Sequence, residues 1–234
     1  MIAKPMNIAL IGYGKMGRLI EQAAVGRDHN IVSRIDIEGN ENGQLLTKDN
    51  LRGANVAIDF TTPEAVVKNI DRVTALGINM VVGTTGWMSQ LGRIRGLVEE
   101  RGVGFVYGSN FSIGVNLFFR LMESAAAQIS SYSEYDPWIH EIHHRAKLDA
   151  PSGTAIKLKQ ILEKSYRGKE FVPASNRAGA VPGTHTVGFD SDADTLTFTH
   201  TARSRQGFAA GAVYAAEWIQ GRKGFYEFPD IFAS

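Results

Sequence analysis

The densest set of reactive side chains lies between His140 and Ala155, in a stretch that reads HEIHHRAKLDAPSGTA. Its first ten residues hold three histidines, a glutamate, an arginine, a lysine and an aspartate. Such groups are costly to bury unless they are paired or used, and histidine and lysine can deliver a proton near neutral pH. A solvated polar strand that leads into a capped helix would explain a single histidine or lysine here. So many titratable groups together indicate an active site for proton transfer.

A turn of small residues, 151–154, follows directly. Proline keeps the residue before it out of the helical region, Ser152 or Thr154 can cap a helix, and Gly153 allows a sharp turn. Apolar residues then recur at helical spacing: Ala155, Leu158, Ile161 and Leu162. A helix is therefore expected to begin near Gly153, and its unpaired N–H groups and positive dipole end suit a carboxylate. Lys147, just upstream, carries charge of the matching sign.

A second constellation opens the chain, where GYGKMG supplies Gly12, Gly14 and Gly17 in a G-x-G-x-x-G pattern. The expected elements run in the order strand, turn, helix, strand and acid, at 6–11, 12–17, 18–24, 30–35 and Asp36. This is the order that dinucleotide binding requires. The first two glycines permit the turn and the approach of a pyrophosphate, Gly17 permits helix packing, and Asp36 suits the ribose hydroxyls. A tight turn without a ligand is the alternative.

The residue after Asp36 is Ile37 rather than arginine. A 2′-phosphate would meet the Asp36 carboxylate without a cation beside it, so NADH is expected to serve at least as well as NADPH. Lys48 or Arg52 could fold back and reverse this preference.

The alternation of strands and helices continues through the N-terminal half and predicts a parallel sheet. Strands are expected at 56–60, 78–82 and 103–107, and helices at 63–76 and 91–101. Two loops rich in small residues, 83–86 and 108–116, follow strands of this sheet. Ligands bind at the carboxyl ends of strands in open α/β sheets. Both loops are therefore candidates for ligand binding, although each could be a plain turn.

The rhythm changes near Asn110, and the second half favours an α+β arrangement. Helices are expected at 115–129, from Gly153 and at 207–220, and antiparallel strands at 181–189 and 195–202. The expected fold class is α/β, with an N-terminal Rossmann dinucleotide-binding domain at 1–110 that is completed by about 207–234. An α+β substrate domain is expected at 111–206.

The segment from His140 to His144, HEIHH, also matches the H-E-x-x-H signature of zinc peptidases. That motif needs a helix, which places its two histidines on one face. On a strand, Glu141 and His143 would share one face, and His140, Ile142 and His144 the other. The local sequence leaves both conformations open, but a dinucleotide-binding N-terminal half weighs against a peptidase. We expect no metal, and the metal content would discriminate between the two.

The composition excludes several classes of protein. The chain has 234 residues, 44% of them hydrophobic, a formal net charge of +1 and no cysteine. A near-neutral chain has no broad field for nucleic acid or membrane surfaces, and without cysteine there are no disulfides or thiolate ligands. The sequence shows no run of about 18 apolar residues and no signal-peptide pattern. A cytoplasmic location is therefore expected, with no nucleic-acid or membrane partner.

These motifs together resemble the 4-hydroxy-tetrahydrodipicolinate reductase (dihydrodipicolinate reductase) family of lysine and diaminopimelate biosynthesis. The resemblance runs nearly end to end, through GYGKMGR, IDFTTPEA, GTTG, NFSIGVN, EIHHRAKLDAPSGTA and ARSRQGFAAGAV. It implies NAD(P)H-dependent reduction of a cyclic imine-type dicarboxylate, with release of water. It also implies a homotetramer built through a mixed sheet in the second domain. A catalytically silent dinucleotide-sensing protein on the same scaffold is the alternative.

The resemblance further implies roles for particular residues. His143 matches the family's proton donor and acceptor, and Lys147 its proton donor. Substrate contacts are expected at His144, Ser152, Gly153, Thr154 and Arg205. Cofactor contacts are expected at Gly12, Tyr13, Gly14, Lys15, Met16, Gly17, Asp36, Gly83, Thr84, Thr85, Gly108, Ser109, Asn110 and Phe111.

Overall fold

The computed structural model describes residues 4–36, 38–40 and 42–232. Ile37, on which the expected cofactor preference partly rests, lies outside the described residues. The chain divides into two compact units: unit 1 consists of residues 1–112 and 205–234, and unit 2 of residues 113–204.

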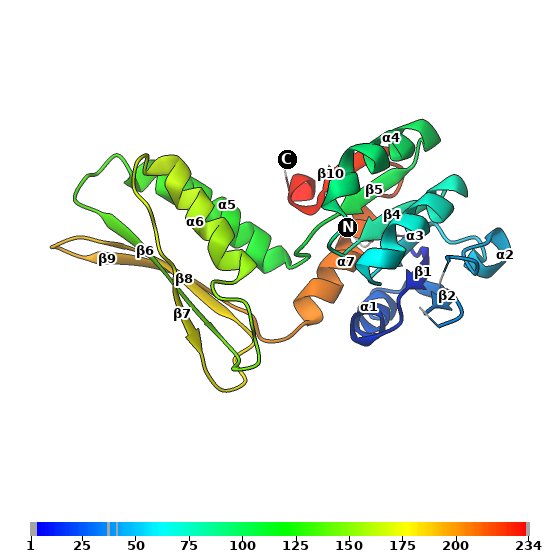
Figure 1. Ribbon diagram of the computed structural model, residues 1–234, viewed down its shortest axis with the longest axis horizontal. Helices are drawn as coiled ribbons and strands as arrows, with labels where there is room; N and C mark the ends of the chain where they lie inside the picture. The colour runs from blue at the N-terminus through cyan, green and yellow to red at the C-terminus, as the bar shows by residue number, and fades with distance from the viewer. Residues whose placement is uncertain (1–3, 37, 41, 233–234) are drawn as a thin grey trace. The chain divides into compact units, whose positions relative to one another are not determined.

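Unit 1 is built on a six-stranded parallel sheet with the strand order β10-β5-β4-β3-β1-β2 (Figure 1). Its strands are β1 (Asn7–Ile11), β2 (Asn30–Ile35), β3 (Val56–Asp59), β4 (Asn79–Val82), β5 (Gly104–Tyr107) and β10 (Gly224–Glu227). Its helices are α1 (Lys15–Val25), α2 (Lys48–Leu51), α3 (Pro63–Ala75), α4 (Leu91–Arg101) and α7 (Gln206–Trp218), with 3₁₀ turns at Met88–Gln90 and Phe228–Phe232.

Short apolar runs form these strands because both faces of the sheet are covered. Ala9 of β1 joins a core cluster that includes Val66 of α3 and Ile94 of α4. Ile8 points to the opposite face, since neighbouring residues of a strand alternate, and it is also fully buried. That face is covered by α1 and α7, which contact β1, β3 and β4 and pack against each other. The parallel α/β class predicted from the sequence is therefore confirmed.

The last strand extends this sheet at its β5 edge. β10 pairs in parallel with β5, which sets Phe225 opposite Phe105. The two rings stack with their centroids 5.1 Å apart. Neither β10 nor α2 is predicted as an element from the sequence: α2 is barely one helical turn long, and GFYE in β10 shows neither a continuous apolar run nor alternation.

Unit 2 is a four-stranded mixed sheet with two helices on one face (Figure 1). Its strands are β6 (Asp136–His143), β7 (Ala174–Arg177), β8 (Thr184–Asp190) and β9 (Thr195–Thr201), in the order β7-β6-β8-β9. β6 pairs in parallel with β7 and antiparallel with β8, which pairs antiparallel with β9. Helices α5 (Ile113–Ile129) and α6 (Gly153–Ser165) cover the sheet, and Phe118, Leu158 and Val187 lie in the core between them.

The histidine-rich segment forms a strand, so the zinc-peptidase alternative is wrong. Residues 136–143 are extended throughout as β6. Glu141 and His143 consequently point into the unit, whereas His140 and Ile142 lie on the other face and are partly exposed. The two histidines of the H-E-x-x-H match, His140 and His144, cannot form the helical ligand pair that the motif needs.

Within unit 2, no described helix or strand covers the second face of the sheet (Figure 1). Trp138 of β6 lies on this face and is 39% exposed. Gly188 of β8 sits directly beneath it, because a Cβ added there would come within 2.1 Å of the indole ring. Two threonine pairs between β8 and β9 are hydrogen-bonded there: Thr184 with Thr201, and Thr186 with Thr199.

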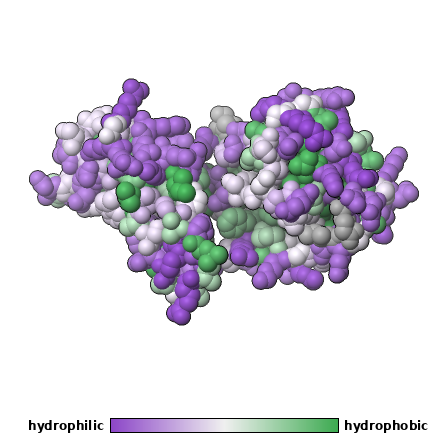
Figure 2. All heavy atoms as spheres, in the orientation of Figure 1, coloured by the Kyte–Doolittle hydropathy of each residue, from purple (hydrophilic) through white to green (hydrophobic). Residues whose placement is uncertain are grey.

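The surface in view is mostly hydrophilic, with small separate hydrophobic patches (Figure 2). Among the described residues, the helices are too short or too polar for any of them to cross a membrane.

Candidate active site

The glycine turn after β1 has the geometry that a bound pyrophosphate needs. Gly12 has a φ of +87°, and a Cβ there would lie 2.3 Å from the Phe60 carbonyl oxygen. A Cβ on Gly17 would lie 2.3 Å from the Gly12 oxygen, so α1 packs tightly against the turn. No described atom lies within 4 Å of a Cβ built on Gly14, which precedes the first residue of α1. The turn therefore leaves open space in front of the α1 N-terminus, where N–H groups can bind an anion.

Residues 13 to 16 lie around this turn. Tyr13 is partly buried, its hydroxyl donates to Glu21, and Arg18 stacks over its ring at 4.9 Å. Lys15 is exposed and Met16 is partly buried at the first turn of α1.

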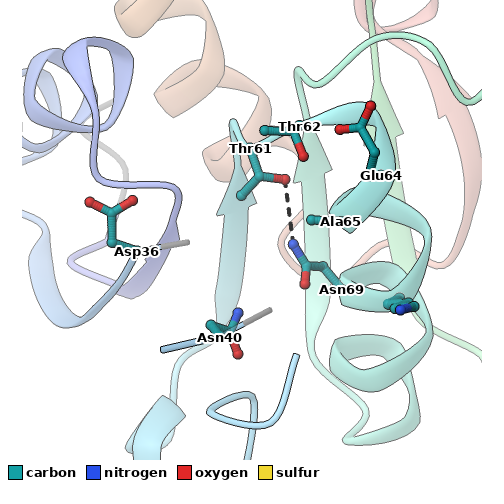
Figure 3. Close-up of a pocket in the computed structure, with 8 residues that line it drawn as sticks. Asp36, Asn40, Thr61, Thr62, Glu64, Ala65 and Asn69 are labelled. Carbon is teal, nitrogen blue, oxygen red and sulfur yellow. Dashed lines mark hydrogen bonds between the residues drawn. The ribbon is translucent and has the colours of Figure 1, made fainter. Parts of the chain in front are cut away.

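Asp36 lies beside a pocket of about 230 Å³ within unit 1 (Figure 3). The Tyr13 N–H donates to Asp36 Oδ1 at 3.4 Å, which ties the acid to the glycine turn. On the other side of the pocket stand residues at the start of α3 (Figure 3). The lining is Asp36, Asn40, Thr61, Thr62, Glu64, Ala65, Lys68 and Asn69. A pocket next to an acid at the end of the second strand suits a ribose and its base.

A buried carboxylate, Asp59, links two of the strand ends that border this region. Thr84 Oγ1 donates to Asp59 at 2.7 Å, Asn69 Nδ2 donates at 2.8 Å, and the Thr61 hydroxyl donates at 2.8 Å. Burial raises the pKa of Asp59, and these hydrogen bonds oppose that effect. The Thr84 side chain, predicted as a cofactor contact, is thus occupied inside the protein, whereas Thr85 is exposed.

The other predicted cofactor loops are packed closely. A Cβ on Gly83 would lie 2.2 Å from the Phe60 ring, and one on Gly108 would lie 2.9 Å from Phe228. Phe111 is buried against Phe228, with ring centroids 4.6 Å apart. Ser109 is exposed at the end of β5, and Asn110 accepts a hydrogen bond from the backbone of Ser112 at 2.8 Å. Of this loop, Ser109 is the exposed residue and therefore the one best placed to meet a ligand.

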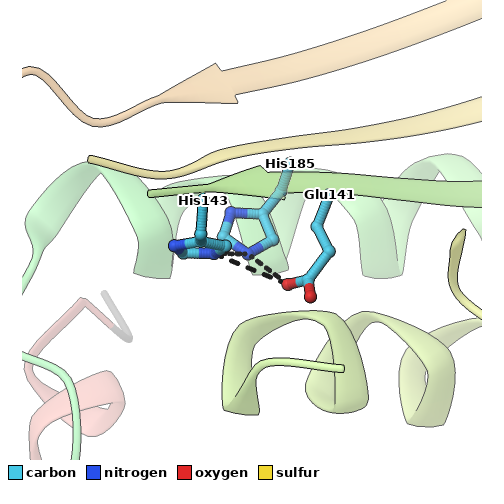
Figure 4. Close-up of side chains that lie close together, drawn as sticks. All are labelled: Glu141, His143 and His185. Carbon is cyan, nitrogen blue, oxygen red and sulfur yellow. Dashed lines mark hydrogen bonds and ion pairs between the residues drawn. The ribbon is translucent and has the colours of Figure 1, made fainter. Parts of the chain in front are cut away.

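In unit 2, three titratable side chains converge at the end of β6 (Figure 4). His143 Nε2 lies 3.3 Å from His185 Nε2 and 3.5 Å from Glu141 Oε2. His185 Nε2 lies 3.4 Å from the same carboxylate. His143 is 8% exposed, His185 is 4% exposed and Glu141 is fully buried. The antiparallel register of β6 and β8 sets Glu141 opposite His185 and so creates this cluster.

Glu141 stays ionised because donors surround it. Burial disfavours the carboxylate, but hydrogen bonds from Ser152, Arg177 and Ser175 outweigh this and lower its pKa to about 2. The Ser152 N–H donates at 3.1 Å, the Ser175 hydroxyl at 2.8 Å and Arg177 Nη2 at 2.9 Å. Burial lowers the pKa of His143, with the Glu141 charge opposing it and the Lys147 charge assisting.

Ser152 joins this cluster to the start of α6. Its hydroxyl oxygen accepts from the Ala155 N–H at 3.2 Å and so caps the helix, as the sequence predicts for this residue or Thr154. Gly153 is exposed, and no described atom lies within 4 Å of a Cβ built there. The N–H groups of Gly153 and Thr154 have no acceptor within the helix, since they belong to its first turn. An anion can therefore approach this end of α6.

Lys147 lies between β6 and α6 and is paired with Asp149. Its Nζ donates to the two carboxylate oxygens of Asp149 at 2.8 and 3.0 Å. An ammonium group has three hydrogens, so one remains for another acceptor. His144 directly follows β6 and is partly exposed. Arg205 lies in unit 1, at the N-cap of α7.

Two members of this site carry no local signal in the sequence, His185 and Arg177. A lone histidine on a strand and a lone arginine on a polar edge strand look like many others. Only the pairing of β6 with β7 and β8 brings them to His143.

The side chains of Glu141, His143 and His185 are of types that bind metals, but their arrangement does not fit a metal ion well. A histidine bound to a metal usually donates its second N–H to an acceptor. Within the described residues, Nδ1 of His185 is buried and has no hydrogen-bond partner. Glu141 already neutralises Arg177. The cluster is therefore a hydrogen-bonded acid–base network.

A parallel sheet with a glycine-rich turn, an acid after its second strand and a separate unit with buried histidines defines the class as a two-domain, dinucleotide-dependent oxidoreductase. Residues 6–111 match the family model described as dihydrodipicolinate reductase, N-terminus, and residues 114–232 match dihydrodipicolinate reductase, C-terminus. The chain belongs to the dihydrodipicolinate reductase family, as the sequence motifs predict.

Individual relatives agree with this. A 4-hydroxy-tetrahydrodipicolinate reductase of Christiangramia forsetii is 43% identical and covers 97% of this chain and 98% of its own. One of Archaeoglobus fulgidus is 37% identical and covers 97% of this chain and 99% of its own. A solved dipicolinate-bound dihydrodipicolinate reductase from Paenisporosarcina sp. TG-14 has a TM-score of 0.79 at 24% identity, covering 97% of this chain and all of that one. The last comparison shows the shared fold.

Proposed function

We propose that the protein reduces 4-hydroxy-tetrahydrodipicolinate to tetrahydrodipicolinate with NADH or NADPH, in lysine and diaminopimelate biosynthesis. Unit 1 would bind the dinucleotide and unit 2 the substrate. The observation that carries the proposal is the stretch 140–155, whose proton-carrying side chains and open helix terminus occur in a chain 43% identical to a named reductase of this type.

The residues of unit 2 fit a substrate with two carboxylates. One carboxylate would lie at the N-terminus of α6, held by the N–H groups of Gly153 and Thr154 beside Ser152. His144 would contribute a further contact, and Arg205, at the N-cap of α7 in unit 1, is the remaining candidate for substrate binding. The capping bond of Ser152 and its link to Glu141 hold this helix terminus in place before any ligand arrives.

The residues of unit 1 fit a dinucleotide. The open space at Gly14 and the pocket at Asp36 would hold the pyrophosphate and the ribose, with the remaining cofactor contacts at residues 83–85 and 108–111. A bound NADH or NADPH would supply a hydride to a ring carbon of the substrate. Charge then moves to a neighbouring ring atom, and Lys147 or His143 donates the proton that this atom requires.

We further propose a cytoplasmic homotetramer. The uncovered face of the unit 2 sheet supports association, because the large apolar ring of Trp138 is exposed there among threonines and is stabilised when another surface covers it.

The activity test is oxidation of NADH in the presence of freshly generated pathway intermediate. His143→Gln and Lys147→Ala should each lower kcat by about a hundredfold or more, since positioned proton transfer contributes roughly 10²–10⁴-fold. The dissociation constant of NADH, measured by fluorescence, should change little. Lys157→Ala, which changes an exposed lysine on α6, is the matched control and should keep full activity.

Two outcomes would count against the proposal. Wild-type protein that binds NADH but never turns over would favour the silent dinucleotide-sensing alternative. Full kcat in both variants would remove His143 and Lys147 from the reaction.

Cofactor preference has its own test. Asp36→Ala should raise the KM for NADH more than the KM for NADPH, because the carboxylate suits free ribose hydroxyls and repels a 2′-phosphate. Parallel kinetics with both cofactors measure the ratio. Equal losses with the two cofactors would contradict the assignment of Asp36.

A further inference from the structure

The Nε2 atom of His143 lies beside two buried side chains. His185 Nε2 lies 3.3 Å away and Glu141 Oε2 lies 3.5 Å away. Glu141 and His143 extend from β6 and His185 from β8, and all three point to one place (Figure 4). A side chain that exchanges a proton is thus held at one nitrogen by a carboxylate and by a second imidazole.

Only one nitrogen of His185 can carry a proton without cost. Within the described part of the chain, Nδ1 is buried and has no hydrogen-bond partner. Nε2 lies 3.0 Å from Ser152 Oγ and 3.4 Å from Glu141 Oε2. Burial lowers the pKa of His185 to about 4, so the ring is neutral at pH 7 and has a single N–H. A proton on Nδ1 would be an unsatisfied buried donor, so the proton sits on Nε2.

The two neighbours favour opposite protonation states of His143. The Glu141 carboxylate attracts the imidazolium and can accept from its Nε2–H, which raises the pKa of His143. The Nε2–H of His185 can donate to His143 only after that nitrogen has lost its proton. A hydrogen bond to the neutral form lowers a pKa. Among the described residues, further charged or titratable groups around the pair include Arg177 of β7, Lys147 after β6 and His200 of β9.

We propose that His185 and Glu141 are positioning residues, which hold the two protonation states of His143 and set the pH at which it exchanges its proton. Glu141 holds the protonated ring, and His185 holds the ring once the proton has left. The geometry of the cluster does not depend on a substrate. The consequence for catalysis rests on the proposed reductase function, in which His143 gives one proton to the substrate and regains one from solvent.

The first experiment is an NMR titration of the free protein, labelled with ¹³C at histidine Cε1 and recorded in EDTA. The chain has six histidines, and the His143 signal is assigned as the one missing from His143→Gln. His185→Phe keeps the ring volume and removes both nitrogens, so the pKa of His143 should rise by about half a pH unit or more. Glu141→Gln keeps the acceptor for Ser152 but removes the charge, so the pKa should fall by a similar amount.

Opposite shifts support the proposal, because loss of packing alone has no reason to move the two variants in opposite directions. His185→Gln, which retains an N–H donor, should return the pKa of His143 to within a few tenths of a unit of wild type. Shifts in the same direction, or no shift in either variant, would overturn it.

A second measurement uses only the wild-type protein, so it tests the proposal even if a variant fails to fold. Nitrogen-15 shifts of wild-type protein report which nitrogen of His185 carries hydrogen. The proposal requires the Nε2–H tautomer and no titration of His185 above pH 5. A proton on Nδ1 would refute it.

The kinetic counterpart is the pH dependence of kcat. If His143 acts as the acid, kcat falls as the pH rises through its pKa. This fall should move to higher pH in His185→Phe and to lower pH in Glu141→Gln, with the KM for NADH unchanged. Opposite NMR shifts in a protein without turnover would retain the positioning role and reject the proposed function, so the two failures are distinguishable.

Discussion

Glu141 illustrates how single residues of this chain combine burial with charge. Its carboxylate is fully buried, yet one backbone N–H, one hydroxyl and Arg177 donate to it. The cost of burial is thereby offset, and the charge is available to a neighbouring imidazole. His185 avoids the cost of burying a charge because its ring is neutral at pH 7.

A pH dependence of stability follows from His185. Its pKa is about 4 in the folded protein and about 6.5 unfolded. The unfolded state therefore binds more protons between these values, and the folded state is destabilised as the pH falls from about 6.5 to 4. This group should cost on the order of 2–3 kcal/mol at pH 4 relative to pH 7.

Urea unfolding of wild type and His185→Phe at pH 7 and pH 4 measures this difference. The variant should lose less stability on acidification than wild type does. Glu141, whose pKa is depressed to about 2, contributes its own loss only below about pH 4.5. An equal loss in both proteins would show that His185 titrates in the folded state like an exposed histidine.

At this scale the sequence predicts only what is local. The density of groups in 140–155 points to His143, Lys147 and Ser152, because they are close along the chain. His185 and Arg177 lie 42 and 36 residues from their partners in the cluster. Their presence depends on strand register, which no local pattern contains.

Among the elements, β6 and β8 matter most for this site. The segment HEIHH is compatible with a helix by motif and with a strand by alternation, and pairing with two neighbours decides for the strand. β8 begins after Gly183, which has a φ of +151°. A Cβ on this glycine would lie 2.7 Å from Cε1 and 3.0 Å from Nδ1 of His143. The His143 ring can occupy its observed position only because Gly183 has no side chain.

Gly183→Ala should displace the His143 ring. We expect kcat to fall roughly tenfold, equivalent to about 1.4 kcal/mol, with NADH affinity unchanged. Gly179→Ala is the control, since Gly179 also has a positive φ but no described atom lies within 4 Å of its added Cβ. Comparable losses of kcat in the two variants would attribute the effect to backbone strain instead of the ring.

The elements of unit 1 are predicted more completely. Strands, helices and the glycine turn follow from apolar runs, caps and spacing, with boundaries within a few residues of those observed. The polar edge strand β7, of sequence ASNR, is not predicted, because its residues have no apolar alternation. It is nevertheless the strand that supplies Ser175 and Arg177 to Glu141.

For the whole molecule, the uncovered sheet face leads to a test of the proposed tetramer. Trp138→Glu places a charge on that face and should give smaller species in sedimentation velocity. Val172→Glu, at an exposed loop residue, is the control and should leave the assembly unchanged. Circular dichroism should show that both variants are folded. A wild-type monomer at micromolar concentration, or a tetramer of unchanged stability in Trp138→Glu, would contradict the proposal.

The strand order of unit 1 bears on how the chain folds as it is made. The edge strand β10 and the covering helix α7 come from residues 206–227, which leave the ribosome after all of unit 2. Until then the hydrophobic side of β3 and β4 lacks its cover, whereas unit 2 already possesses every strand and helix of its own. Synthesis of unit 1 therefore begins before that of unit 2 but ends after it. The nascent chain cannot complete the core of unit 1 until all of unit 2 has been synthesised.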